Sequence, residues 1–309
     1  MMDRRQLLKL LGVTTGMSFL PHMSEAESTP PSATAFSYCL NMATIRGHNL
    51  GFMKELETAS RAGFRSVEIW VDSLKTYLDR GGTVSEVQKR LNDLGLKIEN
   101  AIGFAQWIIE DEAKRKEGLA QMQQEMELLA QVGCKRTAAP PMGATDTPVI
   151  DLKRVAERYR AILDLGDKTG VVPQLEMWGF SKNLSRVSDV MYAALESGHP
   201  SARVLLDVFH LYKGGSSIDT LPLISNSATE IFHMNDHPAN LPASAITDAD
   251  RIYPGDGVAP IARMLRILKK PDQPLIISCE VFNKNYYKKD ALQVAQTALA
   301  KMKAITAGI

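Results

Sequence analysis

The feature that most constrains the fold is an eightfold alternation of two kinds of segment between residue 36 and the C-terminus. Each unit opens with a short apolar run, and a longer stretch follows in which apolar residues return every three or four positions, the spacing of an amphipathic helix. Met122, Met126, Leu129 and Val132 form one such stripe. The eight runs are Phe36–Met42, Ser66–Trp70, Lys97–Ile102, Lys135–Ala139, Val172–Met177, Arg203–Phe209, Glu230–Asn235 and Leu275–Val281.

This alternation predicts a (β/α)8 TIM barrel, formed as a single domain by residues 36–309. Glycine stands just before several runs, for example Gly63 and Gly170, where it suits the left-handed end of the preceding helix. A doubly wound open sheet is the alternative. The stretch after the first run, NMATIRGHNLG, lacks the glycine pattern of a phosphate-binding loop, and we therefore favour the barrel.

The N-terminus differs from the rest of the chain. Arg4 and Arg5 precede a modest apolar run, and Ser24 and Ala26 form a small-x-small cleavage pattern, so that residues 1–26 resemble a twin-arginine export signal. Residues 27–35 follow as a linker rich in Ser, Pro and Thr. The apolar run is too short to be a stable membrane span. We expect an exported, periplasmic protein; a disordered basic start and an uncleaved tether are the alternatives.

The composition of the chain limits which binding partners and which cysteine-based structures are expected. The formal net charge is +1 and no basic block stands out, so nucleic acid is not an expected partner. Cys39, Cys134 and Cys279 are too far apart for a disulfide scaffold or a zinc knuckle, and we expect three buried strand residues. The oligomeric state stays open, a homodimer included.

The last four runs each end in a polar residue of the kind that binds metals: Glu176, Asp207, His233 and Glu280. The carboxyl ends of barrel strands meet at one mouth, and a buried carboxylate without a partner is costly. One shared divalent cation would solve that problem. An oxygen-rich set with one nitrogen suits Mn²⁺, Co²⁺ or Mg²⁺, and Zn²⁺ is compatible. The alternative is four separately satisfied residues, such as helix N-caps or members of ion pairs.

Three further residues are candidates for substrate binding at the same mouth. Glu68 lies near the end of the second run, His210 follows Asp207 in a D-x-x-H pattern, and Arg251 opens a rigid Pro/Gly turn after the seventh run. For each, a structural hydrogen bond or ion pair is the alternative. Tryptophans at strand ends suit the apolar face of a sugar or the core equally well; they are Trp70, Trp107 and Trp178.

From about Ser37 onward the chain resembles the sugar phosphate isomerase/epimerase family of xylose-isomerase-like TIM barrels, which includes ketose 3-epimerases, inosose dehydratase and inosose isomerase. The matching pieces are GFRSVEIW, PQLEMWGFSK, LLDVFHLYKGG, FHMND, RIYPGDG and SCEVFN, in the family's order. The resemblance implies that Glu176, Asp207, His233 and Glu280 bind the metal, and that Glu176 and Glu280 are also the acid/base pair. It further implies that His210 and Arg251 contact the substrate. Lys182 replaces an acid that some ketose epimerases carry, which weakens the transfer of that particular activity.

The predicted reaction is proton abstraction next to a carbonyl through an enediolate, giving a metal-dependent sugar isomerase or epimerase. A lyase or dehydratase on keto-sugars or oxidised (3-keto) glycosides is one alternative, favoured by the expected export because sugar phosphates are mostly cytoplasmic. A non-catalytic sugar-binding barrel is another. An endonuclease-type barrel would need a zinc cluster rich in histidine, which six histidines spread over the chain do not provide.

Overall fold

The computed structural model describes residues 35–224 and 227–309. The predicted export signal, residues 1–26, lies outside the described residues, as does the linker except for Ala35. Both remain predictions. No helix within the described ranges is long and apolar enough to cross a membrane.

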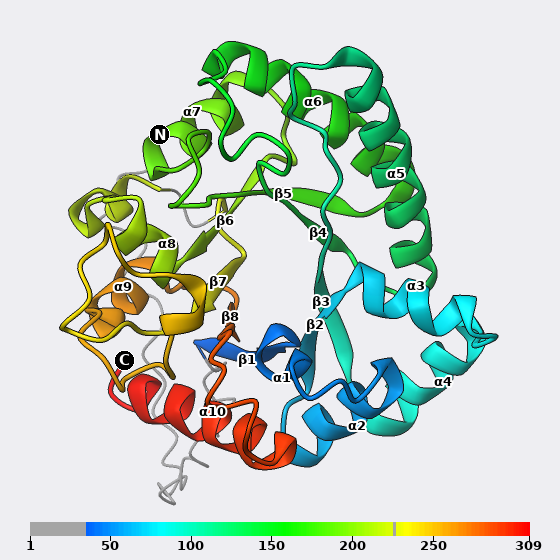
Figure 1. The fold of residues 1–309 in the computed structure, drawn as a ribbon, viewed down its shortest axis with the longest axis vertical. Helices are drawn as coiled ribbons and strands as arrows, with labels where there is room; N and C mark the ends of the chain where they lie inside the picture. Colours follow the sequence, from blue (N-terminus) through cyan, green and yellow to red (C-terminus); the bar gives the residue numbers. More distant parts are fainter. Residues whose placement is uncertain (1–34, 225–226) are drawn as a thin grey trace, which may run out of the picture. The chain divides into compact units, whose positions relative to one another are not determined.

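Eight parallel strands form the centre of the fold, and helices surround them (Figure 1). The strand order is β3-β2-β1-β8-β7-β6-β5-β4, and β3 and β4 lie side by side, which brings the two ends of the sheet together. The predicted (β/α)8 barrel is confirmed, and the open-sheet alternative is wrong. The strands are β1 (Phe36–Asn41), β2 (Ser66–Trp70), β3 (Lys97–Ile102), β4 (Arg136–Ala139), β5 (Val172–Glu176), β6 (Arg203–Asp207), β7 (Ile231–Met234) and β8 (Leu275–Cys279).

Several strands are shorter at their carboxyl ends than the apolar runs suggest. The sixth run was expected to reach Phe209, but β6 ends at Asp207 and the next helix begins at Val208. The Asp207 side chain accepts a hydrogen bond from the backbone N–H of His210 at 2.9 Å and so starts that helix. Val208 and Phe209 are buried in helical conformation, and apolar character alone does not distinguish the two states.

The helices begin and end at residues suited to those positions. Asp111, Asp151 and Asp290 each accept a backbone N–H at the start of a long helix. Gly63 and Gly170 end two helices with φ of 100° and 73°. The helices are α1 (Ala43–Arg46), α2 (Phe52–Ala62), α3 (Val71–Asp79), α4 (Val84–Leu94), α5 (Glu112–Gln131), α6 (Leu152–Thr169), α7 (Val187–Glu196), α8 (Val208–Lys213), α9 (Ile261–Leu268) and α10 (Ala291–Thr306), with short 3-10 turns η1 (Ile218–Leu223) and η2 (Asp248–Asp250).

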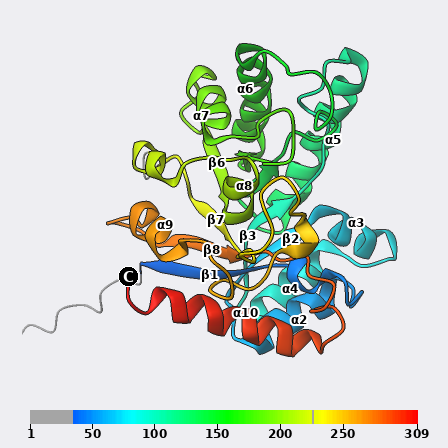
Figure 2. The ribbon, with the colours of Figure 1, turned by 60° about the vertical axis from the view of Figure 1, so that its left-hand side comes forward.

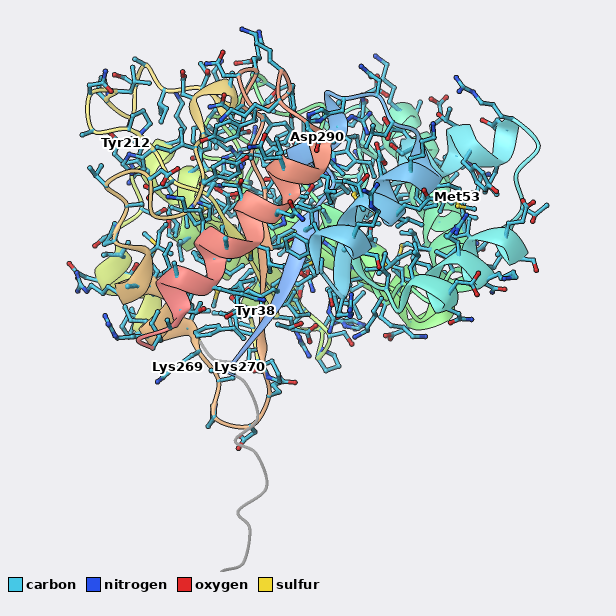
Figure 3. The ribbon with its side chains drawn as sticks, turned by 90° about the horizontal axis from the view of Figure 1, so that it is seen from below. Tyr38, Met53, Tyr212, Lys269, Lys270 and Asp290 are labelled. Atoms are coloured by element: carbon cyan, nitrogen blue, oxygen red, sulfur yellow. The ribbon has the colours of Figure 1, made fainter. Side chains whose placement is uncertain are left out.

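The two ends of the barrel differ. Figure 2 shows α10 running along the outside of β1, as other helices do for other strands. In Figure 3, Tyr212 and Asp290 lie at one edge, where strands β6 and β8 lead into their connections, and Lys269 and Lys270 lie at the opposite edge, just before β8. The strand-end residues predicted to form the site therefore belong to the first of these edges.

Candidate metal centre

Three of the four predicted ligands form one compact buried group. Asp207 ends β6, His233 lies in β7, and Glu280 directly follows β8. One ligand atom of each lies within 4.8 Å of the others. His233 Nδ1 is 3.3 Å from Glu280 Oε2 and 3.8 Å from Asp207 Oδ2. Neighbouring parallel strands thus bring together two acids and one imidazole that lie far apart in the sequence.

Several buried polar atoms at this site have no hydrogen-bond partner, and two of them belong to predicted ligands. His233 Nδ1 approaches the two carboxylates without hydrogen-bond geometry, and Glu176 Oε2 has no partner either. Glu176 ends β5 and lines the same pocket as Glu280, outside the compact group of three. Buried polar atoms left without partners are costly. Three carboxylates and an imidazole with open acceptor positions fit a divalent cation.

Glu68 lies deeper than we expected. The expectation was a substrate contact at the mouth, but the Glu68 side chain is fully buried and does not line the pocket. It contacts His233 Nε2 at 3.0 Å and accepts hydrogen bonds from Asn100 at 2.8 Å and Asn41 at 3.2 Å. The reason is its place in β2, two residues before the strand end, where Trp70 lines the pocket instead. Glu68 therefore orients the His233 ring and leaves Nδ1 directed at the acids.

Arg251 reaches the acids from the connection after β7. Its Nη1 donates to Asp207 Oδ2 at 2.9 Å and to Glu280 Oε2 at 2.8 Å, and its Nη2 donates to Asp248 Oδ1 at 2.5 Å. The guanidinium is buried and also lies 3.2 Å from His210 Nε2. Both predicted substrate contacts, His210 and Arg251, line the pocket. In this arrangement Arg251 supplies positive charge directly to two of the predicted ligands.

The two glutamates differ in protonation. Burial, reinforced by the negative charges of Glu280 and Asp207, raises the pKa of Glu176 to about 8. Burial also acts on Glu280, but the charges of His233 and Arg251 outweigh it and lower the pKa of Glu280 to about 2. Burial lowers the pKa of His233, and the neighbouring Glu68 and Glu280 more than reverse that effect. Two carboxyl groups with opposite pKa shifts are typical of an acid and a base that work together.

The pocket above these groups has a volume of about 400 Å³. The two alternatives for the tryptophans both occur: Trp70 and Trp178 line the pocket, whereas Trp107 is a fully buried core residue whose Nε1 donates to the Pro140 carbonyl at 2.8 Å. Lys182 donates to the Asp146 carbonyl and does not line the pocket. The lining residues are Trp70, Ile102, Phe104, Glu176, Trp178, Phe180, His210, Asp248, Ala249, Arg251, Glu280, Phe282, Lys284 and Tyr287.

Sequence analysis missed several polar residues that support the site. Asn41 ends β1 and donates to Glu280 Oε1 at 2.9 Å, and Asn235 follows β7 and donates to Asp207 Oδ2 at 2.9 Å. Both stand at strand ends, the same signal that identified the four ligands, but amides attract less notice than charged groups. Asp248 lies in η2, and nothing in the sequence indicates its contact with Arg251. Cys39, Cys134 and Cys279 are free and buried as predicted, but only Cys39 and Cys279 lie in strands, since Cys134 precedes β4.

The chain matches known proteins over most of its length. Residues 56–305 match the model of the xylose isomerase-like TIM barrel family, and the chain belongs to that family. A curated relative from Halalkalibacterium halodurans, named inosose isomerase, is 28% identical over 267 residues, which cover 84% of this chain and 93% of the relative.

Solved structures share the fold. A protein described as IolI with a bound zinc atom has a TM-score of 0.81 at 22% identity, covering 88% of this chain and 99% of that one. D-psicose 3-epimerase from Clostridium cellulolyticum, described with D-tagatose, has a TM-score of 0.69 at 17% identity, covering 88% and 99%. The family match and these structural likenesses place this chain on the xylose isomerase-like barrel, as the sequence resemblance implies.

Proposed function

We propose that this chain is a divalent-metal-dependent isomerase or epimerase that moves a proton next to the carbonyl of a sugar or a closely related cyclic polyol ketone. One observation carries the proposal: four consecutive strands end at or next to Glu176, Asp207, His233 and Glu280, of which the last three form one compact buried group while Glu176 and Glu280 line the same pocket. The relative named inosose isomerase supports a sugar-like substrate.

The two glutamates would move the proton of the substrate: one removes it and the other returns it. Without metal, the charges of His233 and Arg251 keep Glu280 ionised, which suits a base, and burial raises the pKa of Glu176, which suits an acid. Asn41 fixes the Glu280 carboxylate through a 2.9 Å hydrogen bond. A base and an acid on different strands of one pocket permit removal of a proton from one side of a substrate carbon and its return at another position.

The metal would be held by Asp207, His233 and Glu280, with Glu176 as the fourth ligand. When bound, a divalent ion supplies positive charge that polarises the carbonyl oxygen and stabilises the enediolate. Three carboxylates and one imidazole favour Mn²⁺, Co²⁺ or Mg²⁺, whereas the zinc of the structurally similar protein favours Zn²⁺. Glu68 keeps the imidazole in place through His233 Nε2.

The proposal is tested by metal analysis of the purified protein, followed by incubation with inososes and keto-sugars in D2O. We expect about one divalent ion per chain and deuterium at the carbon next to the carbonyl. A chelated sample should lose the exchange and regain it when the ion is added back. Exchange that persists unchanged after the ion is removed would overturn metal dependence, and absence of exchange with every substrate would overturn the isomerase proposal.

Product identity separates this reaction from the lyase alternative. If a group on the carbon beyond the deprotonated one leaves, the same pocket performs an elimination on a keto-sugar or an oxidised glycoside. We retain export to the periplasm as part of this alternative, because it would bring the enzyme to glycosides outside the cytoplasm. An unsaturated product with release of the leaving group would identify the lyase.

A further inference from the structure

An arc of aromatic side chains, which we call the aromatic wall, forms one side of the pocket. It comprises residues from the ends of strands and the connections that follow them: Trp70, Phe104, Trp178, Phe180 and Phe282. Adjacent ring centroids are 5.2 Å apart for Trp70–Phe104, 6.4 Å for Phe104–Trp178, 5.2 Å for Trp178–Phe180 and 6.3 Å for Trp70–Phe282. Successive contacts of this length make the arc longer than one pyranose ring.

The pocket floor is polar, and it meets this wall at two rings: the Phe180 ring lies 5.5 Å from the His210 ring, and the Arg251 guanidinium lies 5.2 Å from the Phe282 ring. The carboxylates Glu176 and Glu280 are buried at the pocket floor beside His210 and Arg251. The Trp70 indole donates to Asn41 Oδ1 at 3.3 Å. Phe104, Phe180 and Phe282 offer a ligand apolar surface alone. Phe180 is 42% exposed, so that its ring is accessible to a ligand in the pocket. The pocket thus has a polar part and an apolar part.

Charge at the pocket argues against a phosphorylated substrate. Two lining residues, Arg251 and Lys284, carry a permanent positive charge. Arg251 is already bonded to Asp207, Glu280 and Asp248. Lys284 is exposed to solvent. Phosphate recognition favours several donors or a bidentate guanidinium; the Arg251 guanidinium is already engaged, which leaves the exposed Lys284 as a single point charge on the pocket lining.

We propose that the substrate is an uncharged keto-sugar bearing a planar apolar group, of which an aryl glycoside is the simplest form. The sugar carbonyl lies at the polar floor, and the aryl ring lies against the aromatic wall. The inference rests on the proposed function for the placement of the carbonyl. A pocket of about 400 Å³ falls in the range of roughly 300–1,000 Å³ that holds ligands larger than a single sugar.

Binding of unreactive glycosides tests the aryl preference without requiring turnover. The metal-loaded full-length protein is titrated with phenyl glucoside, methyl glucoside and glucose 6-phosphate, and tryptophan fluorescence reports binding because Trp70 and Trp178 belong to the wall. We expect phenyl glucoside to bind about tenfold more tightly than methyl glucoside, the gain from one aromatic contact plus buried ring surface. Glucose 6-phosphate should bind no better than methyl glucoside.

Phe180→Ala should remove most of the phenyl advantage, measured as the ratio of the two affinities in the same variant, because Phe180 belongs to the wall and its exposed ring contributes little to the core. Tyr192→Ala is the matched control: Tyr192 is 43% exposed on α7 and does not line the pocket. Equal affinity for phenyl and methyl glucoside would overturn the inference. So would tighter binding of the phosphate, or an equal loss in both variants.

Deuterium exchange separates this inference from the proposed function. Matched phenyl and methyl 3-keto-glucosides are incubated with the metal-loaded protein in D2O, and we expect a lower KM for the phenyl compound. Exchange with equal KM for both compounds would overturn the aryl preference and leave the isomerase proposal standing. Selective phenyl binding without exchange in either compound would overturn the isomerase proposal and support the wall as the binding surface.

Discussion

Arg251 supplies a positive charge within the group of predicted metal ligands. It bonds Asp207 and Glu280 from one guanidinium nitrogen, and its planar group lies 4.3 Å from the centre of the Phe209 ring. Buried carboxylates need such compensation. A divalent cation at the same carboxylates would supply it as well. Arg251 and the metal therefore overlap in one role, the neutralisation of the buried acids, and the overlap can be measured.

We predict that Arg251→Met destabilises the protein strongly when metal is absent. The substitution leaves Asp207 and Glu280 without their guanidinium, and removal of one partner of a buried ion pair costs about 3–5 kcal/mol of unfolding free energy. Added divalent metal should recover part of the loss, because an ion that binds only the folded state stabilises it. Urea unfolding with chelator and with metal measures both effects.

The matched control is Arg154→Met. Arg154 pairs with Glu110 on the surface, where both side chains are half exposed, and exposed pairs contribute little. We expect little change with or without metal. An equal loss of stability in the two variants would contradict the role assigned to Arg251.

Glu280→Gln should abolish proton exchange while the protein stays folded. The amide retains the shape of the side chain and can still accept from Asn41, but it cannot take a proton. General base catalysis is worth roughly 10²–10⁴-fold, and we expect a loss of at least that size in deuterium incorporation. Glu196→Gln, an exposed position on α7, serves as the control. Exchange at the wild-type rate in Glu280→Gln would show that another group is the base.

At the site, the residues that end strands can be predicted from the sequence. Residues whose position depends on their depth in the barrel, or on the path of a connection between elements, cannot. Glu176, Asp207, His233 and Glu280 follow apolar runs, and parallel strands bring their ends together. Glu68 was assigned to the mouth because alternation gives the side of a strand but not the depth along the barrel. Phe104 and Phe180 lie in connections, where no periodic pattern predicts direction.

Among the elements, the connection between β7 and α9 positions Arg251. Asp236 holds this connection together: its carboxylate accepts backbone N–H groups of Gly255 and Gly257 at 3.0 Å and of Ala259 at 2.9 Å. Asp236 also pairs through its backbone with Ile252, next to Arg251. A single carboxylate therefore fixes the turn whose entrance carries the guanidinium.

We predict that Gly257→Ala lowers kcat/KM by about tenfold or more and also lowers Tm by a few degrees. A Cβ at this position would lie 2.2 Å from the His237 carbonyl and 2.4 Å from Asp236 Oδ1, so the turn must shift and Arg251 with it. Displacements of about 1 Å at a site can cost 10²-fold in rate. Steady-state kinetics and thermal melting measure the two effects.

Gly308→Ala is the matched control, since no atom lies within 4 Å of the added Cβ. It should change neither quantity. If Gly257→Ala keeps full activity, the turn does not position the guanidinium, and Asp236 has only a structural role.

At the scale of the whole molecule, one junction between neighbouring strands of the barrel, which we call the seam, differs from the other seven. Seven adjacent strand pairs form backbone ladders, and the eighth pair, β3 and β4, does not. Side chains connect this pair: Arg136 Nη1 donates to the Glu99 carbonyl and Thr137 Oγ1 to the Ala101 carbonyl, both at 3.3 Å. The run pattern predicts the number of strands, but it carries no information on which pair is joined in this way.

An ion cluster at the amino ends of the strands extends from this seam. Glu230, just before β7, bonds Arg136 of β4 and accepts from Arg203 Nε of β6 at 3.1 Å. Burial raises the pKa of Glu230, but the two guanidinium groups outweigh burial and lower this pKa below its usual range. The cluster therefore stabilises the fold above the ordinary pKa of a glutamate, and this contribution is lost as the pH falls through the lowered pKa.

We predict that Glu230→Gln lowers the unfolding free energy by about 1 kcal/mol at pH 7, a value kept small because the pair is partly exposed. The difference from wild type should shrink below pH 4 and vanish where Glu230 itself is protonated. Urea unfolding at a series of pH values from 7 to 3 gives both curves. For Glu157→Gln, an exposed position on α6, the difference in unfolding free energy from wild type should stay the same at every pH. A constant offset for Glu230→Gln at every pH would mean that its carboxylate acts through packing and not through charge.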